Sequence, residues 1–476
     1  MSNVVITGSE RARPSGSTVA GPGAGTTIVP IETPTLGDRS YLIHDGRVAV
    51  VIDPQRDIDR VLRLAGAAGV RITHIFETHI HNDYVTGGLA LAGVTGAAYH
   101  VNAADPVAYE RVGVGDGDII EIGPGWRLRV LATPGHTYTH LSYVLEEHGT
   151  ATAVFSGGSL LFGSTGRPDL LGPDHTHELV HHQYASARRL AAELPEQTQV
   201  MPTHGFGSFC SATQTEAVAS TIGAEKSTNP VLTQDENHYV SDLLAGLDAF
   251  PAYYAKMGPA NTAGPGAPDL SPPEPADARQ LRQRLERGEW LVDLRTRTAF
   301  AAGHAPGTLN FGLDGSFATY LGWLIPWGTP VTLLGENAAQ VAQAQREMVR
   351  IGIDRPAAAA TGGPRQWTDG PLDTVERATF ADLAQVRHHR HVTVLDVRRN
   401  LERSASRIDG AWHIPLHELL VRADEIPAGE LWVHCAAGYR ASIAASILLA
   451  RGHRVVAVDD DYSNAAATGL PVIVGA

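Results

Sequence analysis

Cysteine and lysine are both nearly absent from this 476-residue chain. Its only cysteines are Cys210 and Cys435, and its only lysines are Lys226 and Lys256. Two cysteines exclude a disulfide framework and fit a reducing compartment, so we expect a cytoplasmic protein. Basic side chains are outnumbered, with a formal net charge of −14. This charge argues against nucleic acid or an anionic membrane as a main partner.

Long apolar runs are also missing. No stretch reaches the roughly 18 apolar residues of a membrane-spanning helix, and the N-terminus lacks the basic and apolar blocks of a secretory signal. Residues 1–27 are rich in Gly, Ser, Thr and Pro, which predicts a disordered tail. The remaining length is too great for one core and suggests about three domains.

The first part of the chain alternates apolar strand patterns with helix patterns. Strands are predicted at 41–43, 48–52 and 72–76, with a helix over 58–68. This alternation indicates an α/β fold. Four histidines follow apolar runs in loops: His79, His81, His136 and His204, with Asp83 close behind the first two. Imidazole and carboxylate groups gathered in this way predict a metal site.

The His79-Ile80-His81-Asn82-Asp83 motif and the later histidines resemble the metallo-β-lactamase fold, an αββα sandwich expected here over residues 28–258. The 166–169 segment (Gly-Arg-Pro-Asp), and Tyr253-Tyr254 before Asn261, narrow the resemblance to persulfide dioxygenases fused to rhodanese domains. The resemblance implies one Fe or Zn ion.

Two positions depart from that family's pattern. Tyr84 replaces the histidine that closes the first motif, and Gly158 stands where the family places a ligand aspartate. The iron site is therefore expected to be degraded. Three histidines (His79, His81, His136) remain able to hold an ion, with Asp83 and His204 nearby. A metal-free scaffold and an active dioxygenase both stay open at this point.

A segment rich in Pro, Gly and Ala at 259–275 predicts a linker. After it, residues 290–295 match residues 393–398, which indicates an internal duplication. Both copies resemble rhodanese modules, expected over 276–372 and 373–476. The first copy has no cysteine and is predicted to be catalytically silent. In the second, Asp396 and Arg398 are expected to fix a turn, with a supporting catalytic role left open.

Cys435 begins a turn between a predicted strand and a helix expected over 441–451. Helix dipole and loop N–H groups at such a junction favour a thiolate. Gly438 gives the loop backbone freedom, and Arg440 adds a fixed forked cation. The Cys-x4-Arg spacing resembles the active loop of rhodanese sulfurtransferases and is one residue shorter than the Cys-x5-Arg loop of a Cys-phosphatase.

The sequence thus leads to a sulfurtransferase hypothesis. Cys435 would take sulfane sulfur from thiosulfate or a low-molecular-weight persulfide and pass it on. One alternative is an active persulfide dioxygenase–rhodanese fusion, which oxidises glutathione persulfide or a similar persulfide to sulfite or thiosulfate. Another is a sulfur-relay scaffold that serves an acceptor protein. Cys210 is read as a small buried hydrophobe or as a sulfur shuttle at a pocket mouth. A homodimer is left open.

Overall fold

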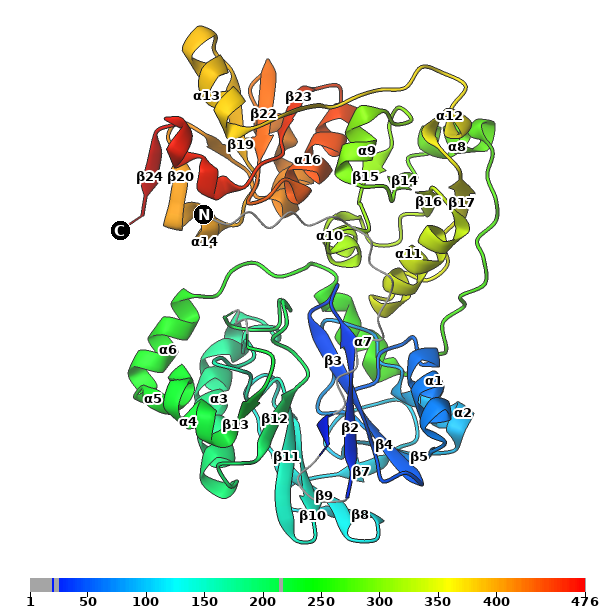
Figure 1. The fold of residues 1–476 in the computed structure, drawn as a ribbon, viewed down its shortest axis with the longest axis vertical. Helices are drawn as coiled ribbons and strands as arrows, with labels where there is room; N and C mark the ends of the chain where they lie inside the picture. The colour runs from blue at the N-terminus through cyan, green and yellow to red at the C-terminus, as the bar shows by residue number, and fades with distance from the viewer. Residues whose placement is uncertain (1–18, 21–24, 214–216, 476) are drawn as a thin grey trace, which may run out of the picture.

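The computed structural model describes residues 19–20, 25–213 and 217–475. Most of the predicted 1–27 tail lies outside these ranges, although Val19–Ala20 forms a short strand, β1, paired with β2. The first domain occupies the lower half of Figure 1, and two smaller α/β modules form the upper half. Among the described residues no helix is both long and apolar enough to cross a bilayer.

Two β-sheets form the centre of the first domain. One contains, in spatial order, β1, β2 (Thr27–Thr33), β3 (Asp38–His44), β4 (Val48–Ile52), β5 (Arg71–Phe76), β6 (Ala98–Asn102) and β7 (Val112–Val114). The other contains β13 (Ser220–Thr221), β12 (Gln199–Pro202), β11 (Thr150–Gly157), β10 (Leu141–Glu147), β9 (Trp126–Ala132) and β8 (Ile119–Gly123).

Apolar side chains from both sheets meet in one core that includes Tyr41, Phe76, Leu128, Tyr143 and Phe155. Helices cover the outer faces: α1 (Asp59–Ala68) and α2 (Gly88–Thr95) on the first sheet, and α3 (Pro173–Glu193), α4 (Ile222–Thr228), α5 (Pro230–Thr233) and α6 (Glu236–Ala245) on the second. Strands buried on both faces explain fully apolar runs such as Val48–Ile52. The predicted αββα sandwich is confirmed.

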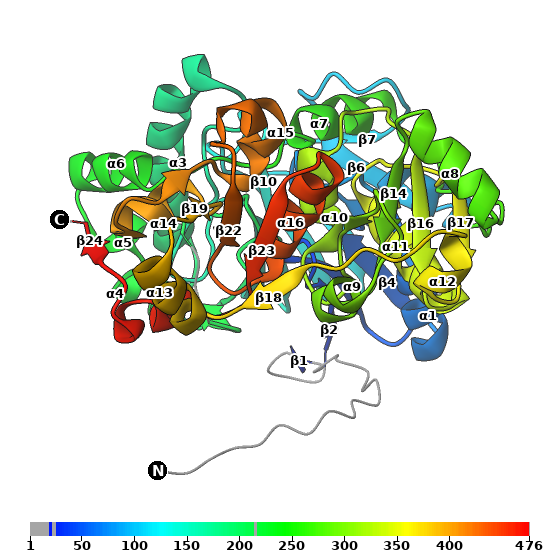
Figure 2. The same ribbon diagram turned by 90° about the horizontal axis from the view of Figure 1, so that it is seen from above.

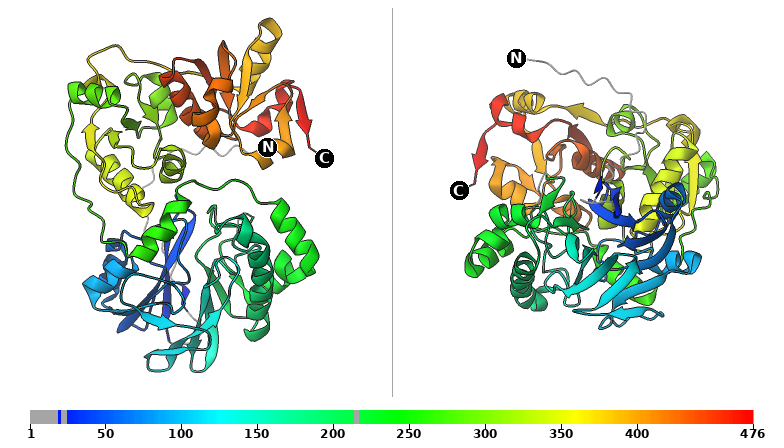
Figure 3. Two further views of the ribbon diagram at one scale, coloured as in Figure 1. Left: turned by 180° about the vertical axis from the view of Figure 1, so that it is seen from behind. Right: turned by 60° about the horizontal axis from the view of Figure 1, so that its bottom comes forward.

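The connection to the upper half differs from the predicted linker. Helix α7 (Tyr254–Ala263) continues through Pro259, so the segment without helix or strand begins only at Gly264. Asn261 explains why the helix extends so far. Its side-chain amide donates to the carbonyls of His81 and Tyr84, 2.8 Å in each case, and its oxygen accepts the Thr86 N–H. Beyond α7 the chain runs along the side of the molecule to α8 (Figure 3).

The two upper modules share one topology. The middle module has four parallel strands in the order β15 (Leu309–Asn310), β14 (Trp290–Asp293), β16 (Val331–Gly335), β17 (Ala358–Thr361). The C-terminal module repeats this order with β21 (Trp412–His413), β19 (Thr393–Asp396), β22 (Glu430–His434), β23 (Arg454–Val458), and adds β18 (Glu376–Ala378) at the edge. A two-stranded sheet, β20 (Ser406–Ile408) with β24 (Val472–Val474), lies beside it.

Helices flank both small sheets. The middle module carries α8 (Ala278–Glu286), α9 (Arg297–Ala302), α10 (Phe317–Leu324), α11 (Ala338–Arg350) and α12 (Pro364–Trp367). The C-terminal module carries α13 (Phe380–His389), α14 (Asn400–Ala405), α15 (Leu419–Arg422) and α16 (Tyr439–Ala450). Seen from above in Figure 2, α16 lies between the two sheets, where Ser442 donates to Asn310 at 2.8 Å.

Both modules pack on the first domain. The Val85 N–H donates to the Arg350 carbonyl at 2.7 Å, and the Arg350 guanidinium pairs with buried Asp57 at 2.7 Å. The C-terminal module meets the same domain through Arg399, whose guanidinium lies over the Phe209 ring at 5.2 Å from its centre, and through the Leu401 N–H, which donates to Asp248 at 3.3 Å. One hydrophobic cluster runs through all three parts, and Tyr84 and Val85, next to the first pair of histidines, belong to it.

Candidate functional site

His79 and His81 lie in the loop after β5, each with one ring nitrogen fixed. The Thr78 hydroxyl donates to Asp53 at 2.7 Å, so it accepts from His79 Nδ1 at 2.9 Å and leaves His79 Nε2 for the site. His81 Nε2 faces the Tyr84 hydroxyl at 2.9 Å and Asp53 at 3.2 Å. Within the described chain His81 Nδ1 is buried and has no hydrogen-bond partner. Tyr84, where the family has a ligand, therefore orients a histidine.

His136 lies in the loop after β9, and one of its ring nitrogens is likewise fixed by a hydrogen bond. Its Nδ1 donates to the Arg167 carbonyl at 2.8 Å, which leaves Nε2 buried and without a partner among the residues described. Burial, together with neighbouring His204, lowers the pKa of His136 to about 3, so the ring is neutral. A neutral imidazole with its other N–H held by an acceptor is the usual state of a metal ligand.

His204 lies between the first-domain loops and two buried carboxylates. Its Nδ1 is 2.9 Å from Asp38 and 3.1 Å from Asp83, and these carboxylates outweigh burial and raise the pKa of His204. Its Nε2 is 3.4 Å from His79 Nε2. Two nitrogen ligands about 2.1 Å from one tetrahedral zinc lie about 3.4 Å apart, so this pair is spaced for an ion.

The predicted metal residues are brought together in overlapping groups of possible ligands. The ligand atoms of His79, His81 and His204 lie within 4.8 Å of one another, and so do those of His136, His204 and Cys210. Asp83 joins Asp38 and His204 in a third group. The unpartnered ring nitrogens and the imidazole-rich donor set fit an Fe or Zn ion.

Gly158 has no room for a ligand side chain. A Cβ atom at this position would clash with the ring of His136, and its N–H already donates to His140 Nε2 at 2.9 Å. Sequence reasoning missed both His140 and Asp38. Neither belongs to a motif, and only the folded chain brings them to the site. The space that the family's aspartate would need is thus filled by the His136 ring.

The second site lies in the C-terminal module. Cys435 follows β22, residues 435–438 form the turn, and α16 starts at Tyr439 with no side-chain cap. Gly438 adopts φ 89°, and a Cβ there would clash with Asp459. The turn therefore requires glycine. Uncapped N–H groups at the start of a helix favour an anion at this end.

Arg440 is held by an acid that the sequence did not indicate. Its two terminal nitrogens meet the two oxygens of Glu402 at 2.6 Å each. Burial opposes ionisation of Glu402, but Arg440 outweighs it and lowers the pKa of Glu402 to about 2. Glu402 lies in α14 and has no motif signal. The bidentate pair fixes the plane of the guanidinium beside the Cys435 turn.

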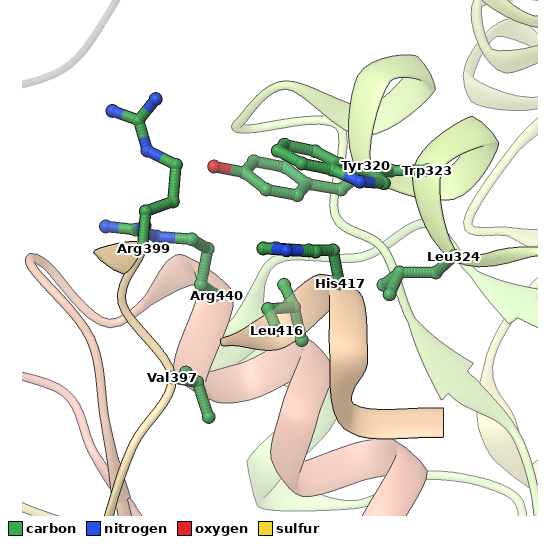
Figure 4. A pocket seen from close by; sticks show the side chains of 8 residues that line it. All are labelled: Tyr320, Trp323, Leu324, Val397, Arg399, Leu416, His417 and Arg440. Atoms are coloured by element: carbon green, nitrogen blue, oxygen red, sulfur yellow. The ribbon is translucent and has the colours of Figure 1, made fainter. Parts of the chain in front are cut away.

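A small pocket opens beside Arg440 and is lined from both modules (Figure 4). Arg399, His417 and Arg440 come from the C-terminal module, whereas Tyr320 and Trp323 come from α10 of the cysteine-free module. Trp323 stacks on His417 with ring centres 5.0 Å apart. In Figure 4 the Tyr320 hydroxyl points toward the two arginines. The pocket combines positive charge with aromatic walls.

Protein-family models match both the first domain and the C-terminal module. The model of the metallo-beta-lactamase superfamily matches residues 36–204, and that of the rhodanese-like domain matches residues 379–468. A hydroxyacylglutathione hydrolase of Pseudomonas entomophila is 32% identical over 222 residues, which are 41% of this chain and 82% of the relative. Human mitochondrial persulfide dioxygenase ETHE1 is 29% identical over 204 residues, 42% of this chain and 74% of the relative.

Other matched relatives are covered over 57% to 86% of their own length. Among solved structures, a metallo-beta-lactamase from Staphylococcus aureus superimposes with a TM-score of 0.63 at 28% identity. That alignment covers 71% of this chain and 99% of the other. It therefore extends beyond the first domain into the modules that follow.

Proposed function

Because the chain belongs to the metallo-beta-lactamase superfamily and carries a C-terminal rhodanese-like domain, we propose that it is a sulfurtransferase working through a persulfide on Cys435. The observation that carries this proposal is the Cys435 turn, which runs into an uncapped helix and has Arg440 fixed beside it. The same features that stabilise a thiolate also stabilise the persulfide anion that follows it.

The reaction takes two displacements. The Cys435 thiolate attacks the outer sulfur of thiosulfate, the S–S bond breaks, and sulfite leaves with the electron pair. A low-molecular-weight persulfide reacts in the same way and releases a thiolate. An acceptor thiolate or sulfite then attacks the terminal sulfur of the Cys435 persulfide and regenerates the Cys435 thiolate. The helix N–H groups and Arg440 hold the negative charge during both steps.

Trapping the intermediate tests this proposal. After incubation with thiosulfate, mass spectrometry should find one extra sulfur atom on the Cys435 peptide, and Cys435→Ser should lower the transfer rate by at least about 1,000-fold. The variant retains Cys210, so the loss would be assigned to Cys435. Transfer at the wild-type rate in Cys435→Ser would refute the proposal. A trapped persulfide with negligible transfer to cyanide would instead favour a relay that hands sulfur to a partner protein.

A second activity is proposed for the first domain, supported by its likeness to the persulfide dioxygenase. The residues able to hold an ion are His79, His81, His136 and His204, with Asp83 beside them. Iron held there would supply the O₂ chemistry for oxidation of a persulfide.

Metal analysis and O₂ uptake test this second activity. An iron content near one per chain, with O₂ uptake on glutathione persulfide that His136→Ala abolishes, would support it. Iron-loaded protein without uptake would leave sulfur transfer as the activity. The scarcity of cysteine supports a cytoplasmic setting for both reactions.

A further inference from the structure

At Gly158 the first domain lacks the carboxylate that its relatives' pattern has, and no neighbouring acid takes the place of this ligand. The His136 ring occupies the space beside Gly158. Asp38 and Asp83 both lie against His204 Nδ1, and neither belongs to the group of ligand atoms that contains His136. A negatively charged ligand for an ion held near His136 would therefore come from another part of the chain.

Cys210 is the side chain that reaches this position. It is fully buried, and its sulfur belongs to the group with His136 and His204 whose ligand atoms all lie within 4.8 Å of one another. Burial raises the pKa of the thiol, and the negative charge of Asp83 raises it further. A thiol that is neutral without a metal loses its proton outright when it binds one.

One peptide segment fixes both Cys210 and His136. The Arg167 N–H donates to the Cys210 carbonyl at 2.8 Å, and the Arg167 carbonyl accepts from His136 Nδ1 at 2.8 Å. The Arg167 side chain is itself locked by Asp169 at 2.6 Å. The outcome is a buried His136 Nε2 that faces the site without a partner in the described part of the chain.

We propose that Cys210 is a metal ligand in the first domain, where its thiolate joins His136 and His204 in place of the carboxylate that Gly158 cannot supply. Mixed thiolate and imidazole donors suit Zn²⁺ or Fe²⁺. Three protein ligands leave a position open for a small molecule. Metal binding releases the thiol proton to solvent, so metal affinity rises with pH.

X-ray absorption of the full chain loaded with one equivalent of Zn²⁺ tests this assignment. We expect a sulfur neighbour at about 2.3 Å from the metal, and its loss in Cys210→Ser. The Cys435→Ser variant keeps the sulfur neighbour, because Cys210 is then the chain's only thiol. Cobalt substitution gives a second signature, a thiolate-to-metal charge-transfer band that is present in Cys435→Ser and absent in Cys210→Ser.

Three outcomes would overturn the proposal: only nitrogen and oxygen neighbours in the wild type, a sulfur neighbour that persists in Cys210→Ser, or no metal bound at all. If Cys210→Ser does not fold, the Cys435→Ser spectrum decides alone. The readout is independent of sulfur transfer, since persulfide trapping at Cys435 proceeds without the metal. Failure of one proposal is thus distinguishable from failure of the other.

Discussion

The middle and C-terminal modules have the same strand order and differ where the central strand meets the next helix. In the middle module two residues separate β16 from α11, and the Asn337 side chain caps the helix by accepting the Gln340 N–H at 3.1 Å. In the C-terminal module four residues separate β22 from α16, and Gly438 offers no side-chain cap. One copy caps the start of its helix with a side chain, whereas the other leaves that end without a side-chain cap.

This contrast separates scaffold from function. The two copies retain the parallel sheet and also a buried Asp–Arg pair after the first long strand. Arg295 Nε lies 3.0 Å from Asp293, and Arg398 Nε lies 3.0 Å from Asp396. Each arginine also donates to a backbone carbonyl: Arg295 to that of Gly303 at 2.9 Å, and Arg398 to that of Ser406 at 2.7 Å. Because the copy without cysteine has the same pair, a role in fixing the turn is favoured; for Asp396 and Arg398 that role stays a prediction.

The largest effect is expected from breaking these pairs. Asp293→Asn and Asp396→Asn each leave a buried arginine without its charged partner, so each should lower the free energy of unfolding by about 3 kcal/mol. Denaturant titration of the two variants would measure it. The comparison predicts similar losses in the two modules and an unchanged kcat for the folded Asp396→Asn protein. A fall in kcat at wild-type stability would instead give Asp396 a catalytic role.

An intermediate effect is expected at Arg440, which has no counterpart in the shorter loop of the middle module. Arg440→Lys keeps the charge but loses the bidentate contact with Glu402, so the cation is no longer fixed beside Cys435. We expect kcat/KM for thiosulfate to fall about 10-fold, equivalent to about 1.4 kcal/mol. Arg451→Lys, one residue beyond the end of α16, is the matched control and should leave kcat/KM unchanged. Equal values for Arg440→Lys and the wild type would show that charge alone suffices.

Much of the architecture could be predicted because local patterns and motifs carry it. The strand predicted over 48–52 is β4, and the helix predicted over 58–68 differs from α1 by one residue. The linker was placed too early because Pro259 and its neighbouring Gly and Ala residues suggest irregular structure. Tertiary contacts override that composition, since Asn261 binds three backbone groups of the histidine loop.

The partners of the site residues could not be predicted. Asp38 meets His204 across 166 positions, and Glu402 meets Arg440 across 38. Neither acid has a motif or a periodic position, so only the folded chain pairs them. The same limit applies to the pocket, because a cysteine-free module gives no sequence signal that it lines a pocket beside Arg440 of its neighbour. The assignments of Cys435, Gly438 and Arg440 as catalytic residues remain predictions.

The smallest effect is expected where the two modules meet. Tyr320 belongs to the copy without cysteine, yet its hydroxyl points toward Arg399 and Arg440 of the copy that contains Cys435 (Figure 4). Tyr320→Phe removes only that hydroxyl, so we expect KM for thiosulfate to rise about threefold, or about 0.6 kcal/mol, with kcat unchanged. Trp327→Phe, at a 43% exposed position of the same module, is the control. Unchanged KM in both variants would limit the middle module to packing, whereas a change only in Tyr320→Phe would show that the duplicated copy without a nucleophile still contributes to substrate binding.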